Sequence, residues 1–311
     1  MVRFVRWGID DAEQPVGSKA VILGETERYR KRTGTEDDLP ETSRPSQANV
    51  SPPTSPFTVA VLGAGRVGGS FARALRAAGH DVLAELRRDD DPSPIARADV
   101  IVIAVPDDAL AGAAAAVARL GRAGAVVIHT CGIQGLAPLE GCGPFVAAIH
   151  PAVPVASSEQ PFTGVIFGVT APDAMKEWSA RFVADIGGTP LFVPEEERVR
   201  YHAALSTASN FAVALAGDSA DLLGGYETLI PLLRATVENI AQLGPDAALT
   251  GPIVRGDAGT VSAHLRALPA HLLESYVANA RRTLARAVAS GRLDEAEAAR
   301  VAEALEGAMV R

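Results

Sequence analysis

The chain has 311 residues, of which 48% are hydrophobic and 21% are charged. This length and composition are typical of a globular protein that is large enough for two domains, each with a hydrophobic core of its own. The formal net charge is -8, and no block of lysine and arginine residues occurs. We therefore expect no nucleic acid and no anionic membrane as the main partner, and we expect a small-molecule ligand instead.

The cysteines and the hydropathy of the chain exclude further classes of protein. Cys131 and Cys142 form no CxxC pair and have no histidine at the spacing of a zinc site, so we expect neither a bound metal nor a disulfide framework. No apolar run approaches the roughly 20 residues of a membrane-spanning helix. The amino terminus also lacks the apolar core of a signal peptide. These features predict a cytoplasmic protein.

Residues 1–56 differ in character from the rest of the chain. They mix charges without a helical period and end in the stretch GTEDDLPETSRPSQANVSPPTSP, rich in proline, serine, threonine and acidic residues. Such a segment buries too little apolar surface to offset the entropy lost on ordering. It is predicted to be a disordered tail or an over-long gene start, with a short ordered piece around KAVILGE as a further alternative.

From residue 57 onward, short apolar runs alternate with a helical pattern at 66–79 and another at 172–188. The apolar runs, each ended by turn or polar residues, lie at 57–65, 80–88, 98–106, 124–130, 144–150, 164–170 and 189–194. Continuous apolar strands of this kind predict a parallel sheet that is covered on both faces. Only about a dozen residues join the second run to the third, so that crossover is expected to lack a proper helix.

The strand pattern stops at Pro194. Three glutamates follow this proline, and acidic residues near the first turn are typical of a helix start. Helical patterns then continue to the end, interrupted by GGYE, LGPDAALTGPIVRGDAG and SGRLDE. We therefore predict an α/β protein with a Rossmann-type parallel sheet domain at 57–194 and an all-α helical domain at 195–311.

A glycine-rich turn follows the first predicted strand. Gly63, Gly65 and Gly68 form a G-x-G-x-x-G motif between a strand and a helix. In dinucleotide-binding proteins the first glycine makes the turn, the second admits the pyrophosphate against the backbone, and the third lets helix and strand pack closely. The predicted cofactor contacts are the three glycines with Ala64, Arg66 and Val67 between them, and Val105 and Pro106 after the third strand.

The end of the second strand selects the dinucleotide. NAD enzymes place a carboxylate there for the ribose hydroxyls, whereas an arginine suits the additional phosphate of NADP. Arg87 and Arg88 occupy this position, with Glu85 two residues earlier. We predict NADP, although Glu85 argues for NAD and the arginines can also be read as part of a solvated turn.

Four motifs give the chain a family resemblance: GAGRVGGSFARAL, HPAVPVAS, YHAALSTASNF and ALTGPIVRGDAGTVSAHL. Over about residues 57–290 the sequence resembles an uncharacterised bacterial family in which a Rossmann-like NADP oxidoreductase domain precedes a helical domain of unknown function. More distantly it resembles the 6-phosphogluconate-dehydrogenase-like superfamily, which includes ketopantoate reductase, prephenate dehydrogenase and pyrroline-5-carboxylate reductase. The resemblance implies a substrate site between the sheet domain and the helical domain, and a homodimer formed through the helices.

Polar residues after two strands are candidates for the site, because ligands of open parallel sheets bind beyond the carboxyl ends of the strands. His150 ends the strand PFVAAIH and is followed by a proline, an arrangement similar to the His-Pro of prephenate dehydrogenases. A catalytic and a structural histidine are equally open readings. Asp107 and Asp108 are predicted to cap the helix that follows them.

The segment YHAALSTASN carries a narrow polar stripe on a helix that is otherwise apolar. His202, Ser206, Ser209 and Asn210 fall within roughly 100° of arc at the helical angle per residue. The stripe either faces solvent or lines a pocket. If it faces a bound nicotinamide, His202 is predicted to be the acid or base, with Ser206 and Asn210 as orienting donors to a substrate oxygen.

The loop TGPIVRGDAGTVSAH is a second candidate substrate site and resembles, loosely, the substrate loop of pyrroline-5-carboxylate reductases. Arg255 is predicted to bind a substrate carboxylate, and Thr260 lies at the helix start that follows. A structural pair of Arg255 with Asp257 is the alternative reading.

The related ketopantoate and hydroxyisobutyrate enzymes use a lysine in the helical domain, but no lysine follows Pro194 in this chain. Because arginine stays protonated, it cannot replace that lysine in proton transfer. The sequence therefore predicts an NADP(H)-dependent oxidoreductase that transfers a hydride to or from a small carboxylate-bearing metabolite, with histidine assistance or on an imine. The alternatives are a ketopantoate-reductase-like enzyme and a non-catalytic NADP-binding sensor or partner subunit.

Overall fold

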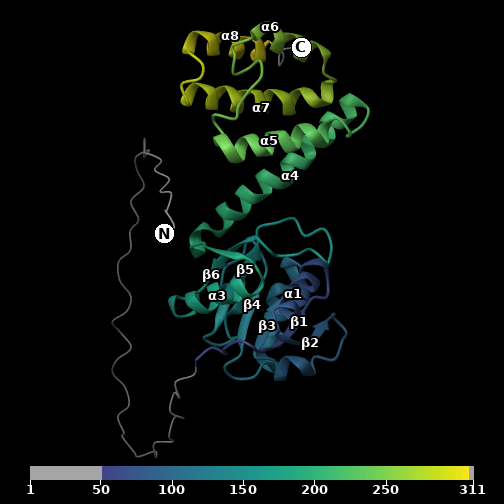
Figure 1. Ribbon diagram of the computed structural model, residues 1–311, viewed down its shortest axis with the longest axis vertical. Coiled ribbons are helices and arrows are strands. Elements are labelled where there is room, and N and C mark those ends of the chain that lie inside the picture. Colours follow the sequence, from purple (N-terminus) through teal and green to yellow (C-terminus); the bar gives the residue numbers. More distant parts are fainter. Residues whose placement is uncertain (1–50, 308–311) are drawn as a thin grey trace, which may run out of the picture. The chain divides into compact units, whose positions relative to one another are not determined.

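The computed structural model describes residues 51–307, and its first part is a seven-stranded sheet (Figure 1). The strand order is β2-β1-β3-β4-β5-β6-β7. All neighbouring strands are parallel except β5 and β6. The elements of this part are β1 (Thr58–Leu62), α1 (Arg66–Ala77), β2 (Asp81–Leu86), β3 (Val100–Ile103), α2 (Leu110–Leu120), β4 (Val126–His129), β5 (Val146–Pro151), β6 (Ile166–Thr170), α3 (Asp173–Asp185) and β7 (Thr189–Phe192).

Each face of the sheet belongs to a separate core, which explains why the strands read as continuous apolar runs. In β1 the side chains of Val59 and Val61 join a cluster with residues of α1 and α3. Those of Ala60 and Leu62 join a cluster with residues of α2. Successive side chains of a strand point to opposite faces, so both must be apolar when both faces are covered.

This architecture confirms the predicted α/β class with a Rossmann-type sheet, with one correction. β6 runs antiparallel to β5, with His150 opposite Gly168, whereas an all-parallel sheet was expected. The residues between these strands form no helix, and an antiparallel neighbour does not need the long crossover that a parallel one requires. The crossover from β2 to β3 contains only a short 3-10 helix, Ser93–Arg97, as its length predicted.

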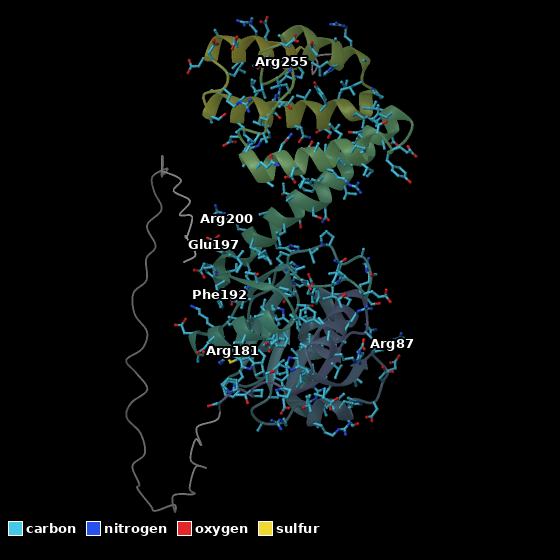
Figure 2. All side chains as sticks on the ribbon, viewed as in Figure 1. Arg87, Arg181, Phe192, Glu197, Arg200 and Arg255 are labelled. Carbon is cyan, nitrogen blue, oxygen red and sulfur yellow. The ribbon has the colours of Figure 1, made fainter. Side chains whose placement is uncertain are left out.

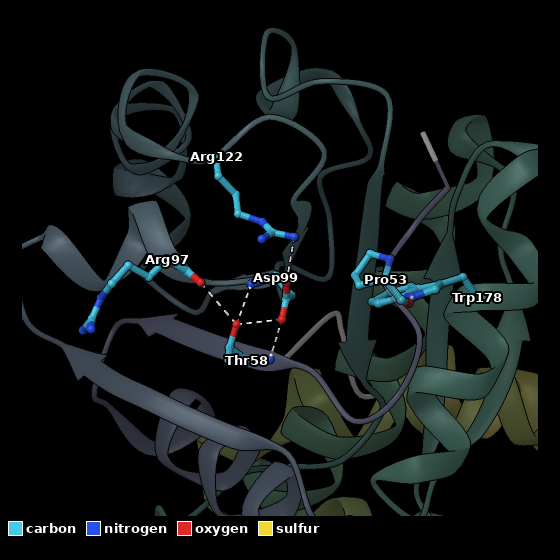
Figure 3. Close-up of polar contacts among 6 residues, drawn as sticks. All are labelled: Pro53, Thr58, Arg97, Asp99, Arg122 and Trp178. Carbon is cyan, nitrogen blue, oxygen red and sulfur yellow. Dashed lines mark hydrogen bonds and ion pairs between the residues drawn. The ribbon is translucent and has the colours of Figure 1, made fainter. Parts of the chain in front are cut away.

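Polar contacts fix the start of β1 to the segment before β3 (Figure 3). The backbone N–H and the hydroxyl of Thr58 both donate to the Asp99 carboxylate, at 2.8 and 2.7 Å. The other carboxylate oxygen of Asp99 lies 2.7 Å from the Arg122 guanidinium. These contacts lie at the opposite end of β1 from the glycine-rich turn.

The segment before β1 lies partly inside the described residues. The Trp178 indole N–H donates to the carbonyl of Pro53 at 2.8 Å (Figure 3), and residues 51–55 border a cavity of about 420 Å³ next to α3. The rest of the predicted tail, including KAVILGE, lies outside the described residues.

Helices make up the described chain after β7. A 3-10 turn, Glu195–Glu197, leads into the first of them, and the left-handed Gly224 ends it, as the GGYE break predicts. Val261, Val277 and Val301 from the last three helices form one buried cluster. The helices are α4 (Arg198–Leu223), α5 (Leu229–Leu243), α6 (Ala258–Ala267), α7 (Ala270–Ala289) and α8 (Glu295–Glu306). In the described part of the chain, none of the helices is long and apolar enough to cross a membrane.

The helices α4 and α5 bury few of their own side chains. Only Arg198 is buried in α4, and only Leu229 in α5. Large apolar side chains on both helices are exposed, including Phe211, Val213, Leu215, Leu222, Leu223, Ile230, Leu232, Val237, Ile240 and Leu243. So many exposed large apolar side chains on two neighbouring helices are typical of an interaction site.

Candidate functional site

Each glycine of the turn after β1 has a distinct steric role. Gly63 has a φ of 102°, and a Cβ atom there would collide with the carbonyl oxygen of Ala104, just after β3. A Cβ atom at Gly68 would collide with the carbonyl oxygen of Gly63. At Gly65, by contrast, an added Cβ atom would meet nothing within 4 Å. The first and third glycines therefore permit close packing, while the second leaves open space at the start of α1.

The start of α1 is free to bind an anion. Gly65 is its N-cap, no side chain caps the helix, and its first turn contains no acidic residue. The backbone N–H groups of a helix's first turn have no partner within the helix and lie at the positive end of its dipole. A phosphate placed against Gly65 would satisfy them.

A cavity of about 620 Å³ adjoins this turn and extends along the ends of β1, β2 and β3. Arg87 and Arg88, both exposed, line it together with Asp90; Figure 2 shows Arg87 at the surface. The Asp90 carboxylate accepts a 2.7 Å hydrogen bond from the backbone N–H of Arg87 and so holds this turn. Further lining residues include Leu62, Gly63, Gly65, Leu86, Pro92, Ile95, Ala104, Val105, Pro106 and Ala109.

Glu85, the residue that argued for NAD, is engaged elsewhere. Its carboxylate lies 2.6 Å from the Arg76 guanidinium of α1 and does not line the cavity. The charged side chains at the end of β2 that do line it are two arginines and Asp90.

A smaller cavity, of about 270 Å³, lies next to the first, since Ala104 and Val105 line both cavities. Two histidines from different elements meet there: His150 at the end of β5 and His202 in the second turn of α4. Their ring centroids are 5.9 Å apart. The other lining residues are Arg66, Val67, Asp107, Thr130, Cys131, Gly132, Pro151, Val153 and Val155.

Tyr201 holds His150 from the side away from this cavity. Its hydroxyl lies 3.1 Å from His150 Nδ1, and its ring packs on Gly168 of β6, where a Cβ atom would collide with it. A Cβ atom at Gly132 would come within 3.0 Å of His150 Nε2. Gly132 thus leaves room at the ring edge of His150 that carries Nε2.

The electrostatic surroundings keep His150 neutral. Burial lowers its pKa to about 4, and the positive charge of Arg198 adds to this effect, as does His202. At neutral pH the ring is therefore an uncharged imidazole, with one nitrogen directed to Tyr201 and the other available to a ligand.

His129, fully buried at the end of β4, has a structural role. Its Nδ1 accepts from the backbone N–H of Cys131 at 3.2 Å, and its Nε2 bonds to the carbonyl of Gly135 at 2.6 Å. Both contacts are satisfied by the neutral tautomer with hydrogen on Nε2. Burial lowers the pKa of His129 to about 4, so the ring is neutral at pH 7. Its two hydrogen bonds order the loop that contains Gly132.

The remaining residues of the polar stripe lie away from the two histidines. Ser206 is half-buried and Asn210 is exposed, and neither lines the 270 Å³ cavity. At about 1.5 Å of rise per residue they follow His202 along α4 by roughly 6 and 12 Å. The structure therefore brings His202 to His150 but does not bring the rest of the stripe to them.

In the loop before α6, Asp257 caps the helix, and Thr260 in the first turn donates to it. Its backbone N–H and hydroxyl both donate to the Asp257 carboxylate, at 2.9 and 2.7 Å. Arg255 is exposed (Figure 2), and its charge contributes to lowering the pKa of Asp257, after the hydrogen bonds from Thr260. Neither Arg255 nor Thr260 lines either of the two cavities.

The predicted capping by Asp107 and Asp108 is wrong. Both lie in a short 3-10 helix, Asp107–Ala109, that precedes α2, and no side chain caps either helix. Asp107 instead lines the cavity that contains His150 and His202.

Four residues near His150 were not predicted as part of the site: Tyr201, Gly132, His129 and Arg198. Tyr201 could have been suspected because it directly precedes His202. Gly132 could have been suspected because it lies in the loop that follows β4. His129 and Arg198 could not, since burial is what distinguishes them from other polar residues at element ends.

Two family models match different parts of the chain. Residues 86–151 match the family model described as a Rossmann-like domain, and residues 165–283 match the one described as Domain of unknown function (DUF2520). No curated protein matches the sequence significantly.

Several solved structures share the fold. A Bacteroides fragilis protein provisionally described as an NADP oxidoreductase is 20% identical, with a TM-score of 0.60 over 75% of this chain and 97% of its own. A protein from Thermotoga maritima is 24% identical, with a TM-score of 0.52 over 67% and 88%. The pyrroline carboxylate reductase of Plasmodium falciparum, solved with NADP bound, is 14% identical, with a TM-score of 0.51 over 79% and 98%.

These identities show a shared fold, and the two family models agree with the family that the sequence motifs resemble. Part of the chain thus resembles a Rossmann-like domain, and a later part matches the model of the DUF2520 family.

Proposed function

We propose that the protein is an NADP(H)-dependent oxidoreductase that transfers a hydride to or from a small, carboxylate-bearing oxo acid or imine. The observation that carries this proposal is that Ala104 and Val105 line both cavities, which are therefore neighbours. One cavity has the glycine turn and two arginines, and the other has two histidines. A dinucleotide in the first would reach the second with its nicotinamide end.

The first cavity fits NADP in three respects. Gly65 leaves the helix start open to a pyrophosphate, the volume of about 620 Å³ suits a nucleotide, and Arg87 with Arg88 can bind an additional phosphate. Glu85, which could have accepted from ribose hydroxyls, pairs with Arg76 instead. The predicted contacts at Ala64, Arg66 and Val67 belong to the same turn and first helical residues.

In the second cavity, the two histidines supply the polar groups of the reaction. A bound nicotinamide supplies or accepts the hydride. His202 is the proposed acid or base, because it lines the cavity from α4 and its ring is not held by a short hydrogen bond within the described residues. His150, fixed by Tyr201 and neutral, offers its Nε2 side as a hydrogen-bond partner for the substrate oxygen or nitrogen. Ser206 and Asn210 remain proposed orienting groups only if α4 moves on substrate binding.

The substrate carboxylate has two candidate anchors. Arg255 was predicted from its loop, and Arg66 is the arginine that lines the smaller cavity. An Arg66→Ala and an Arg255→Ala variant would distinguish them, because loss of a carboxylate anchor raises KM for the acid much more than for its ester.

The test is a turnover assay with NADPH and a panel of 2-oxo acids and cyclic imines. The proposal predicts oxidation of NADPH with at least one substrate, and a loss of about a hundredfold or more in kcat for His202→Gln. Turnover that survives the combined loss of His202 and Asn210 would contradict the assigned roles. NADPH binding with no turnover across the panel would favour a non-catalytic sensor instead.

A further inference from the structure

The side chain that fixes α4 to the sheet is Arg198, the first residue of the helix. It is only 1% exposed. One guanidinium nitrogen, Nη2, donates to the carbonyl of Cys131 at 2.6 Å, and the other, Nη1, donates to the Thr170 hydroxyl at 3.1 Å. The Thr170 hydroxyl in turn donates to the carbonyl of Val193 at 2.6 Å. One side chain therefore ties the start of α4 to the loop after β4, to the end of β6 and to the segment after β7.

This arrangement costs free energy that stability alone does not explain. A buried guanidinium is expensive to desolvate unless a carboxylate or a full set of hydrogen bonds compensates it. Arg198 forms no ion pair with a described carboxylate, and its Nε has no hydrogen-bond partner among the described residues. Arg200, two residues later, is exposed and lies 3.5 Å from Glu197 (Figure 2), which is the usual fate of an arginine at a helix start.

Arg198 acts on the cavity through its neighbours. Tyr201 is the next residue along the same helix face, and its ring centroid lies 5.9 Å from the Arg198 guanidinium carbon. Tyr201 holds His150 by its hydroxyl, and His202 follows Tyr201 directly. Cys131, whose carbonyl Arg198 holds, precedes the Gly132 that makes room beside both histidine rings.

We propose that Arg198 is a positioning residue of the site: it fixes Tyr201 and His202 on α4 relative to His150 on β5, and so holds the His150 ring in one hydrogen-bonding state. The inference rests on the proposed function only in taking His150 and His202 as the polar groups of the substrate cavity. Arg198 itself lines neither cavity.

The charge has a direct physical consequence for His150. Titratable or charged groups near His150 are Arg198 and His202 on α4, Tyr201 beside them, His129 at the end of β4 and Asp107 after β3. Of these, Arg198 is permanently charged and fully buried, so solvent screens it least. Its positive charge disfavours protonation of His150 and favours negative charge that develops on a ligand atom at the ring.

The experiment follows His150 by NMR in protein labelled with ¹³C and ¹⁵N histidine, without substrate. The chain has six histidines, so loss of one signal in His150→Gln assigns the ring. Wild-type His150 is expected to stay neutral down to about pH 5 with one predominant tautomer, since its pKa is about 4.

Three variants separate charge from position. Arg198→Met removes both, and we expect the titration midpoint of His150 to rise by about half a pH unit or more and both tautomers to appear. Arg198→Lys keeps the charge but cannot span Cys131 and Thr170, so the midpoint should stay near that of the wild type while the tautomers mix. Thr170→Val leaves the guanidinium in place with one acceptor lost, and a smaller change in the tautomer ratio is expected.

The matched control is Arg200→Met, which removes an exposed arginine from the same helical turn and should leave both signals unchanged. The inference is overturned if Arg198→Met folds and its His150 midpoint and tautomer ratio equal those of the wild type. If Arg198→Met does not fold, Arg198→Lys and Thr170→Val decide by the same readout, and wild-type signals in both overturn it. NADPH binding, measured on every variant, tests the proposed function separately, because Arg198 lies outside the cofactor cavity.

Discussion

Burial affects the protonation of His129 and His150 in the sheet domain, and this has a consequence for stability. Burial lowers the pKa of His129 and of His150 from 6.5 to about 4. Well above pH 6.5 neither the folded nor the unfolded chain protonates them, so they contribute no pH dependence to the free energy of unfolding. Between pH 6.5 and 4 the unfolded chain binds protons that the folded chain excludes, and stability falls as the pH falls.

We predict a loss of up to about 1.4 kcal/mol per pH unit for each of these rings in that window. Urea unfolding of wild type and His129→Gln at pH 7, 6 and 5 measures it. Glutamine keeps a donor for Gly135 but does not titrate, so the variant should be less stable at pH 7 and lose less stability on acidification. Parallel pH dependences for the two proteins would show that His129 is not buried in the neutral form.

The glycines of the turn after β1 predict two opposite phenotypes. Gly68→Ala places a methyl group on the backbone carbonyl of Gly63, so it should lower the free energy of unfolding by about 3 kcal/mol or more. Gly65→Ala meets no atom within 4 Å and has a backbone φ of -88°, which alanine adopts easily. It should leave the Tm nearly unchanged yet weaken NADPH binding by about tenfold or more, because the methyl group occupies the approach to the phosphates.

Differential scanning fluorimetry and NADPH titration of the two variants check this contrast. A Gly65→Ala protein that binds NADPH as tightly as the wild type would contradict the proposed role of the open helix start.

For single residues, the sequence could predict a role only where that role depends on the spacing from a strand. Gly63, Gly65 and Arg87 stand at fixed offsets from a strand, and the structure places them around one cavity. Arg198 and Arg200 look alike in sequence, and only burial shows which one enters the fold. Likewise, Asp107 reads as a helix cap until the structure shows that it lines the site.

Among the elements, α4 and α5 carry the next prediction. Their exposed apolar side chains require a cover, and a second copy of the chain is the proposed one, in agreement with the homodimer that the family resemblance implies. Val213 and Val237 are 72% and 66% exposed. Changing both to aspartate should convert a dimer into a monomer, measured by light scattering coupled to size-exclusion chromatography.

Ala299→Asp is the control, since it places an aspartate at an exposed position of α8 and should leave the oligomeric state unchanged. A wild-type protein that is monomeric at micromolar concentration would refute the homodimer.

Strands were predictable because they are continuous apolar runs that end in turn or polar residues. Helices were predictable because their apolar periodicity extends over many residues. The direction of β6 was not predicted, although the stretch before it contains no helical pattern, and a parallel neighbour needs a crossover that is usually a helix. The position of α4 relative to β5 had no signal of this kind, since it depends on contacts between residues about fifty positions apart.

On the scale of the whole molecule, Ala104 and Val105 line two neighbouring cavities, one with the predicted cofactor residues and one with the two histidines of the predicted reaction site. The fold class, the order of the two domains and the glycine turn were all readable from sequence. The pairing of His150 with His202 was not, because one lies on a strand and the other on a helix.

The central claim is that the first cavity binds NADP(H), and a fluorescence titration of the full chain with NADPH and NADH tests it most directly. The account predicts saturable binding of NADPH that is about tenfold or more tighter than binding of NADH. Arg87→Ala should abolish this preference, and Arg73→Ala, which removes an exposed arginine of α1, should retain it. Binding of neither cofactor, or an unchanged preference in Arg87→Ala, would contradict the account.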